Sequence, residues 1–376
     1  MPFHSSRHPD GEVRPYWNES AYYSLTPTEA AEVEVASDDL HALCLEAVEQ
    51  VISQARYAEL GLDPELAPYF EASWEDEPPS LYGRFDLRYD GSGPPLLLEY
   101  NADTPTMLLE SALMQLQWAW QTHPETDQFN RLHNQLVAVW EHLATWLPDR
   151  RVTFAWTETE DSGEDLMTVA YLRDTAVQAG LSTAMVPVER LGWDAGARCF
   201  TDVTGERIGT LFKLYPWEWL LGEDGAPQLI QALDTTWFIE PLWKLVLSNK
   251  GILPLLWESF PGHPHLLQAY RDGPRDLSGW VRKPLLSREG ANISVRLPDG
   301  EQQDMADQGY GDEGYIWQQL APLPDLGGGH AVIGSWIVGQ KACGIGVRES
   351  DGLVTDVHSR FVPHLIEPEP TEPQRT

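Results

Sequence analysis

The hydrophobic positions between residues 26 and 51 follow the period of an α-helix. Directly before them, Thr26-Pro27-Thr28-Glu29 supplies a capping hydroxyl, a proline for the first turn and a glutamate at the third helical position. The pattern therefore predicts a long amphipathic helix. Its apolar residues are Val33, Ala36, Leu40, Leu43, Ala47, Val48 and Val51.

A second pattern, of short apolar runs around a turn, begins at residue 81. Leu81–Arg88 and Leu96–Asn101 are strand-like and flank the turn sequence YDGSG, which predicts a β-hairpin. Glu99 and Asn101 lie two residues apart on the second strand, so their side chains face the same way. The sequence DTP at 103–105 is expected to cap and start the next helix, through either its Asp or its Thr.

The middle and the end of the chain differ in pattern. Residues 152–156 are strand-like, 165–180 helical and 182–186 strand-like, which predicts a βαβ unit with parallel strands. Residues 207–214 predict a further strand. After Lys250, short β-rich runs separated by glycine-rich turns predict a mostly antiparallel lobe. The fold class expected from these patterns is α/β (α+β).

The composition is that of a folded protein. A chain of 376 residues with 16 Trp can bury a large core and suggests two or three domains. No apolar run approaches membrane-spanning length, and the N-terminal sequence MPFHSSRHPDGEVRPY lacks the apolar segment of a signal peptide. We therefore expect a cytoplasmic protein with no membrane partner. Three widely spaced cysteines without a CxxC motif predict buried or idle thiols.

A net charge of -33 is the most unusual property of the composition. It repels nucleic acid and anionic membranes, so neither is expected as a partner. Three interpretations remain: an acidic surface that keeps the protein soluble, attraction of a cationic substrate such as a polyamine, and mimicry of nucleic acid. Charge alone does not choose among them.

The predicted hairpin carries a candidate metal site. Asp86 on its first strand can meet Glu99 and Asn101 on its second strand across the pair. Carboxylate and amide oxygens suit Mg²⁺, which commonly keeps open positions for substrate phosphates. The alternative interpretation is a solvated polar hairpin, and spacing alone does not exclude it.

Five ordered segments of the chain resemble the synthetase domain of glutathionylspermidine synthases, most closely the stand-alone acid–amine ligases without an amidase domain. The resemblance runs from about Tyr16 to Ile366. It implies an ATP-grasp fold with permuted order, in which the metal-binding hairpin precedes a β-rich nucleotide-binding lobe. The segments are YGRFDLRYDGSGPPLLLEYNADTPT, SNKGILPLLWESFPGHPHLL, VRKPLLSREGANISV, YIWQQLAPLP and VIGSWIVGQKACGIGVRES.

The resemblance also implies roles for individual residues. The magnesium ligands are Asp86, Glu99 and Asn101; the catalytic arginines, which stabilise charge at the reacting centre, are Arg84, Arg288 and Arg348. Arg84 also contacts the acid substrate, together with Thr104 and Thr106. The ATP contacts are Lys250, Lys283, Glu289, Gly290, Gln318, Gln319, Leu320 and Ala321.

Two segments depart from the family pattern. The acidic stretch at 157–165 falls roughly where the family places carboxylates that contact the substrates, so Glu160 is the substrate residue expected there, with Glu158 and Asp161 as neighbours. In KLYPWEW, Leu214 stands where the family has a threonine. The lost hydroxyl weakens the case for glutathione as the acid.

The sequence thus predicts an ATP- and Mg²⁺-dependent ligase that joins a carboxylic acid to an amine through an acylphosphate. Glutathione or another peptide is the candidate acid, and a polyamine or an amino acid is the candidate amine. The alternatives are a catalytically silent ATP-binding partner protein and an acidic mimic of nucleic acid. The expected domains are a helical and hairpin region at 1–150, an α/β region at 151–247, and a β-rich nucleotide-binding lobe at 248–376. The oligomeric state stays open.

Overall fold

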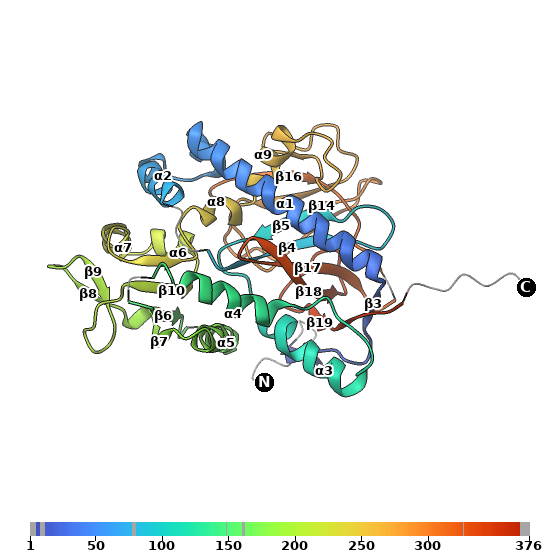
Figure 1. Cartoon of the computed structure of the whole chain (residues 1–376). Helices are drawn as coiled ribbons and strands as arrows, with labels where there is room; N and C mark the ends of the chain where they lie inside the picture. The colour runs from blue at the N-terminus through green and yellow to red at the C-terminus, as the bar shows by residue number, and fades with distance from the viewer. Residues whose placement is uncertain are drawn as a thin grey trace, which may run out of the picture.

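The computed structural model describes residues 5–7, 12–76, 80–147, 149–159, 162–325 and 327–368. A five-stranded antiparallel sheet lies at its centre, in the order β19-β18-β17-β4-β5 (Figure 1). The predicted hairpin is confirmed as β4–β5, and it forms one edge of this sheet. The strands of the central sheet are β4 (Tyr82–Arg88), β5 (Leu96–Asn101), β17 (His330–Val338), β18 (Lys341–Ser350) and β19 (Arg360–Val362).

Two further sheets flank the central one. The parallel sheet has the order β11-β10-β6-β7, and the second antiparallel sheet has the order β12-β16-β13-β14-β15. The parallel strands are β6 (Arg151–Trp156), β7 (Ser182–Pro187), β10 (Thr210–Leu214) and β11 (Trp237–Ile239). The antiparallel strands are β12 (Ala269–Tyr270), β13 (Trp280–Pro284), β14 (Ser294–Arg296), β15 (Gln302–Asp304) and β16 (Tyr315–Gln319).

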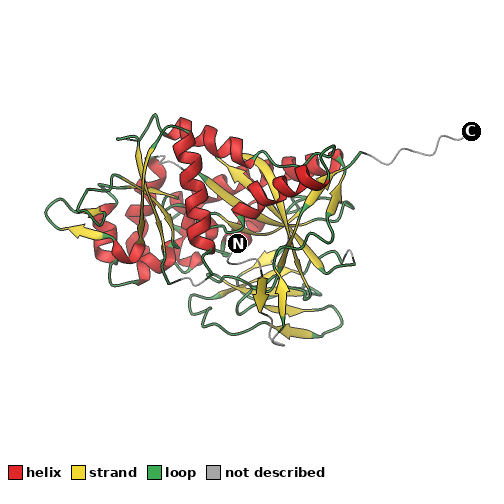
Figure 2. Ribbon diagram, turned by 90° about the horizontal axis from the view of Figure 1, so that it is seen from below, coloured by secondary structure: helices red, strands yellow, loops and turns green. Residues whose placement is uncertain are grey.

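Helices surround the parallel sheet and cover the central one, whereas the second antiparallel sheet lies in a strand-rich part (Figure 2). The helices are α1 (Pro27–Ser53), α2 (Ala67–Glu75), α3 (Gln115–Thr122), α4 (Leu132–Leu143), α5 (Glu164–Gln178), α6 (Trp217–Gly222), α7 (Ala226–Ala232), α8 (Lys244–Ser248) and α9 (Ile252–Ser259). The remaining strands form pairs: β1 (Ser5–Arg7) with β2 (Val13–Pro15), β3 (Tyr23–Leu25) with β20 (His364–Ile366), and β8 (Gly192–Asp194) with β9 (Cys199–Thr201).

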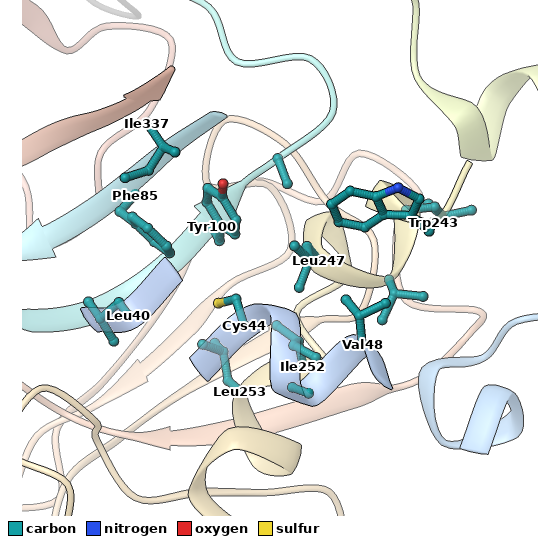
Figure 3. Packing of buried hydrophobic residues seen from close by; sticks show 14 of the residues in the cluster. Leu40, Cys44, Val48, Phe85, Tyr100, Trp243, Leu247, Ile252, Leu253 and Ile337 are labelled. Atoms are coloured by element: carbon teal, nitrogen blue, oxygen red, sulfur yellow. The ribbon is translucent and has the colours of Figure 1, made fainter. Parts of the chain in front are cut away.

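The long helix predicted from the first pattern is α1. Thr26 and Glu29 form the expected capping box, with Glu29 N–H donating to the Thr26 hydroxyl at 3.2 Å and Thr26 N–H donating to the Glu29 carboxylate at 2.7 Å. The apolar stripe of α1 packs against the central sheet and against α8 and α9, where Leu40, Cys44 and Val48 meet side chains from these elements (Figure 3). This core supports the face of the sheet that lies behind the candidate site.

Two predictions about local structure need correction. No helix begins at Pro105; regular helix starts only after Met107, which has a φ of 69°. Asp103 is buried and accepts hydrogen bonds from Lys213 Nζ at 2.6 Å and from Trp217 N–H at 3.0 Å. It therefore fixes the start of α6 and the end of β10, so its carboxylate does not cap the helix that follows it in sequence.

The strands after Lys250 are mostly antiparallel, as predicted, but they divide among three sheets, and β20 pairs in parallel with β3. β12 to β16 form the separate antiparallel sheet, whereas β17, β18 and β19 share the central sheet with the hairpin from the first third of the chain. The hairpin is also tied to the α/β region, because the Glu240 carboxylate accepts from the N–H groups of Leu81 and Tyr82, each at 2.9 Å. The division of the chain into three domains stays a prediction.

The predicted βαβ unit is confirmed: β6, α5 and β7 follow each other, and β6 and β7 are parallel. All three cysteines are free and buried, as expected. Among the described residues, no helix has the length and apolar character needed to cross a membrane.

Candidate active site

The hairpin presents four polar side chains on one face. Asp86 lies directly opposite Glu99, and Arg84 lies opposite Asn101. Opposed residues and residues two apart share a face of a sheet, so all four point the same way. Asn101 Nδ2 lies 3.3 Å from Asp86 Oδ2 and 3.3 Å from Glu99 Oε1. The amide thus bridges the two carboxylates that the sequence singled out.

Two arginines surround the Asp86 carboxylate. Arg84 Nε donates to Asp86 Oδ1 at 2.8 Å, and Arg348 from β18 donates to Asp86 Oδ2. Gly334 on β17, opposite Asp86, leaves room for the Arg84 side chain, because a Cβ at this position would lie 2.8 Å from Arg84 Cδ. Strands β4 and β18, which lie on either side of β17, therefore bring two positive charges to one buried aspartate.

Two buried lysines approach the hairpin from the side of the second antiparallel sheet. Lys250 Nζ lies 3.4 Å from Glu99 Oε2 and donates to the Ser287 carbonyl at 2.7 Å. Lys283 Nζ donates to the Leu98 carbonyl and to Gln318 Oε1, both at 2.8 Å. Both ammonium groups thus stand beside β5, near Glu99.

The charged groups around Glu99 and Lys283 shift the pKa values of both side chains. Burial raises the pKa of Glu99, but the positive charges of Lys250, Lys283 and Arg348 outweigh burial and hold this pKa well below its usual range. Burial, with a smaller contribution from the neighbouring Lys250, lowers the pKa of Lys283 to about 8, and the charge of Glu99 opposes the shift. At neutral pH the Lys283 ammonium is therefore a counter-charge for an anionic ligand.

The SREGAN loop closes a third side of the site. Arg288 Nη1 donates to the Thr104 hydroxyl at 3.0 Å and Nη2 donates to Glu218 Oε1 at 2.9 Å. Its guanidinium lies 5.3 Å from the Trp219 ring centroid. Gly290 has a φ of 74°, and a Cβ there would lie 2.8 Å from the backbone oxygen of Thr355. The loop is therefore held against both α6 and the segment that follows β18.

One cavity, with a volume of about 470 Å³, connects these groups. All of the predicted site residues that the structure describes line it. Glu160 and Asp161 lie outside the described residues. Glu158 is described: its carboxylate pairs with Arg190 at 3.0 Å, and it is not among the residues that line the cavity.

The four expected adenine contacts, residues 318–321, line the cavity. Two of them use their backbone N–H groups within the protein, because Gln319 donates to the Gln268 carbonyl at 2.7 Å and Leu320 donates to the Gly279 carbonyl at 3.0 Å. The cavity wall also contains apolar residues that sequence reasoning missed: Leu98, Val281, Ile293, Leu323 and Val332. An apolar wall of this kind suits a flat heterocyclic ring.

A second group of missed residues lines the cavity near Arg84 and Thr106: Tyr16, Ser162, Glu164 and Asp165. Their carboxylates come from the first turn of α5. The only signal in the sequence is the acidic stretch that ends at Asp165, and nothing local in the sequence connects it with Tyr16.

The donor set can be tested against a divalent metal ion. No group of three or more His, Cys, Asp or Glu side chains suited to a metal occurs in the described ranges, so an ion here would need the Asn101 amide as well as Asp86 and Glu99. The three side chains converge, and turning the Asn101 amide about its last bond exchanges Nδ2 for Oδ1. An all-oxygen set with two carboxylates fits Mg²⁺.

The fold and site together define a mixed α/β protein of the ATP-grasp type. The chain belongs to the glutathionylspermidine synthase preATP-grasp family, whose model matches residues 1–367. A Haemophilus influenzae protein named "Putative acid--amine ligase" is 39% identical over 372 residues, which cover 96% of this chain and 93% of that protein. These relationships confirm the predicted family and the class of enzyme, an ATP-dependent ligase.

Longer relatives share the same region. Trypanothione synthetase of Crithidia fasciculata is 28% identical, and the match covers 86% of this chain but 53% of that protein. The bifunctional glutathionylspermidine synthetase/amidase of Escherichia coli is also 28% identical, with coverage of 93% and 60%. This chain thus spans somewhat more than half the length of both relatives.

A solved structure supports the fold independently of sequence. A glutathione synthetase-like effector from Globodera pallida superposes with a TM-score of 0.60 at 7% identity, and the match covers 97% of this chain and 93% of that structure. At this identity the likeness concerns the fold alone.

Proposed function

We propose that this protein uses ATP to phosphorylate a peptide carboxylate and then joins the acyl group to a primary amine, releasing ADP and phosphate. The observation that carries the proposal is the convergence of Asp86, Glu99 and Asn101 with two lysines and three arginines on one cavity. Phosphoryl transfer depends mainly on positioning and on cations that neutralise developing charge.

Each group of cavity residues has its own role in the proposed reaction. Lys250 and Lys283 bind the ATP phosphates, and the backbone of residues 318–321 holds the adenine. Asp86, Glu99 and Asn101 would hold Mg²⁺, which supplies Lewis-acid stabilisation of the phosphates when it is bound. Arg84, Arg288 and Arg348 stabilise the negative charge at the reacting centre.

The substrates are assigned by chemistry. Thr104 and Thr106 contact the acid, a peptide such as glutathione, since relatives are named for glutathionylspermidine and trypanothione synthesis. The acidic stretch with Glu160, together with Glu164 and Asp165 in the cavity wall, favours a cationic amine such as a polyamine over a neutral amino acid.

The test is ADP release measured over panels of acids and amines, with mass spectrometry of the product. We expect ADP formation that requires an acid and an amide whose mass equals acid plus amine minus water. Tight ATP binding without ADP release over the whole panel would instead support a catalytically silent ATP-binding protein.

A further inference from the structure

One buried carboxylate beside the cavity has no role in the function proposed above. Glu110 is 1% exposed, and its Oε1 atom is buried without a hydrogen-bond partner among the described residues. A buried polar atom without a partner costs free energy. Its position next to the cavity therefore calls for a functional explanation.

Tyr16 stands between Glu110 and the cavity. Tyr16 lines the cavity, whereas Glu110 does not, and the two side chains are hydrogen-bonded to each other. Glu110 also follows a segment that contacts the predicted reacting centre. Arg84 Nη1 donates to the Thr106 carbonyl at 2.7 Å, and Glu110 lies four residues after Thr106 in the chain. A path from the cavity to the Glu110 carboxylate thus runs through the Tyr16 hydroxyl.

The backbone that presents Glu110 is irregular. A π-helical turn occupies Glu110–Met114, and Met107 before it has a φ of 69°. Side chains hold this conformation, since Ser111 Oγ donates to the Met107 carbonyl at 2.9 Å and Gln115 Nε2 donates to the Ser111 carbonyl at 2.7 Å. Single π-helical turns inside helices occur frequently at functional sites.

The charged groups around the pair favour proton exchange near neutral pH. Burial and then the neighbouring Glu164 raise the pKa of Glu110 to about 7, whereas the hydrogen bond from Tyr16 and the charge of Arg84 oppose the shift. Burial, with Glu110 and Glu164, raises the pKa of Tyr16 well above its usual value, and Arg348 opposes this shift. Tyr16 therefore keeps its proton, while Glu110 exchanges one at working pH, where a general base acts best.

We propose that Glu110 is the base that accepts a proton from the attacking amine, relayed through the Tyr16 hydroxyl. This step rests on the proposed ligase function. The ammonium nitrogen loses two protons as its bond to the acyl carbon forms and the bond from that carbon to the phosphate oxygen breaks. One proton passes to the Tyr16 oxygen while the Tyr16 proton passes to Glu110; the other leaves with the phosphate.

The variants Glu110→Gln and Tyr16→Phe test the relay, with first-turnover ADP and amide formation measured separately from pH 5.5 to 9. We expect each variant to lower kcat for amide formation with a cationic amine about 10²-fold and to lose the decline in rate below about pH 7. ADP release in the first turnover should stay unchanged. Hydroxylamine, which is already neutral at pH 7, should restore the rate of both variants.

Glu32→Gln is the matched control, because Glu32 accepts a hydrogen bond from Tyr89 but does not line the cavity. It should keep the wild-type rate and pH profile. Wild-type rates and profiles in Glu110→Gln or Tyr16→Phe, or a loss of first-turnover ADP in both, would overturn the relay and leave the ligase standing. If Glu110→Gln does not fold, Tyr16→Phe decides alone. Absence of ADP release from the wild type with every acid would overturn both proposals.

Discussion

Asp86 and Glu99 show how the surroundings of a side chain set its chemistry. Asp86 accepts hydrogen bonds from Arg84, Asn101 and Arg348, and Glu99 pairs with Lys250. Both carboxylates are therefore already surrounded by cationic side chains. A bound metal ion has to compete with these arginines and lysines, which are also the groups expected to turn toward the phosphates.

The metal assignment predicts that replacing Asn101, an uncharged ligand, weakens the binding of a divalent metal ion. Asn101→Leu removes one ligand oxygen while Asp86 and Glu99 stay in place. We expect the affinity for Mn²⁺ in the presence of nucleotide to fall at least about tenfold, which is about 1.4 kcal/mol. A crystal structure with Mg²⁺ and nucleotide should place oxygens of all three side chains about 2.0–2.1 Å from the ion; ligands elsewhere would contradict the assignment.

Lys283 predicts a pH dependence of nucleotide binding. Its pKa is lowered to about 8, so the ammonium form is present below pH 8 and is lost as the pH rises through this value. If the cation binds phosphate, calorimetry should show constant ATP affinity from pH 7 to 8 and a loss of about tenfold per pH unit above it. Lys283→Met should bind ATP weakly with no such slope, and a slope that survives this substitution would assign the titration to another group.

Two connections between elements determine the shape of the site. The segment after β5 joins three regions, because Asp103 pairs with Lys213 at the end of β10 while Thr104 accepts from Arg288 in the SREGAN loop. Glu218 in the first turn of α6 holds the same arginine. The SREGAN loop, which is expected to cover the phosphates, is thus bound to α6 through Arg288. Movement of this loop requires the contacts of Arg288 with Thr104 and Glu218 to break.

Gly290 tests whether the loop must keep its present path. Gly290→Ala adds both the cost of a positive φ, about 1 kcal/mol, and a contact of 2.8 Å with the Thr355 oxygen. We expect kcat for ligation to fall about tenfold or more. Gly205→Ala is the control, since Gly205 has a φ of 82° but nothing lies within 4 Å of the added Cβ. Equal loss of activity in both would mean that backbone strain alone is responsible.

The distribution of charge over the whole molecule is uneven. The net charge is -33, yet five of the 25 Lys and Arg residues line one cavity, namely Arg84, Lys250, Lys283, Arg288 and Arg348. The acidic remainder attracts cations over long range, whereas these five cations, which share the cavity wall with six carboxylates, are the groups expected to bind anions at contact. A protein organised in this way can bring a cationic amine to an activated, anionic acid.

Salt dependence separates these two effects for the amine. Long-range attraction is screened within about 8 Å at physiological ionic strength, so KM for a polyamine should rise as salt increases. For an amine that is uncharged at the assay pH, KM should change little with salt. Residual preference for the polycation at high salt would reflect contact with cavity carboxylates. If neutral amines are preferred at both low and high salt, the acidic charge serves solubility and the polyamine assignment fails.

The sequence by itself determined the local elements and the reaction class. Capping residues and a helical apolar stripe define α1, and alternation around a turn defines the hairpin that holds Asp86 and Glu99, because these features depend on residues a few positions apart. The family motifs extended this to the predicted metal, phosphate and adenine residues of the cavity, since each motif is a contiguous segment, but not to its apolar wall or to Tyr16, Glu164 and Asp165.

Only the tertiary structure decided which distant groups meet. Asp103 appears in the sequence as a helix cap, yet its carboxylate pairs with Lys213, 110 positions away. Strands β17 to β19 share a sheet with the hairpin, although more than 200 residues separate them in the chain. The contact between Tyr16 and Glu110 likewise has no local signal. Burial and pairing over such separations depend on how sheets and helices pack, which spacing along the chain does not encode.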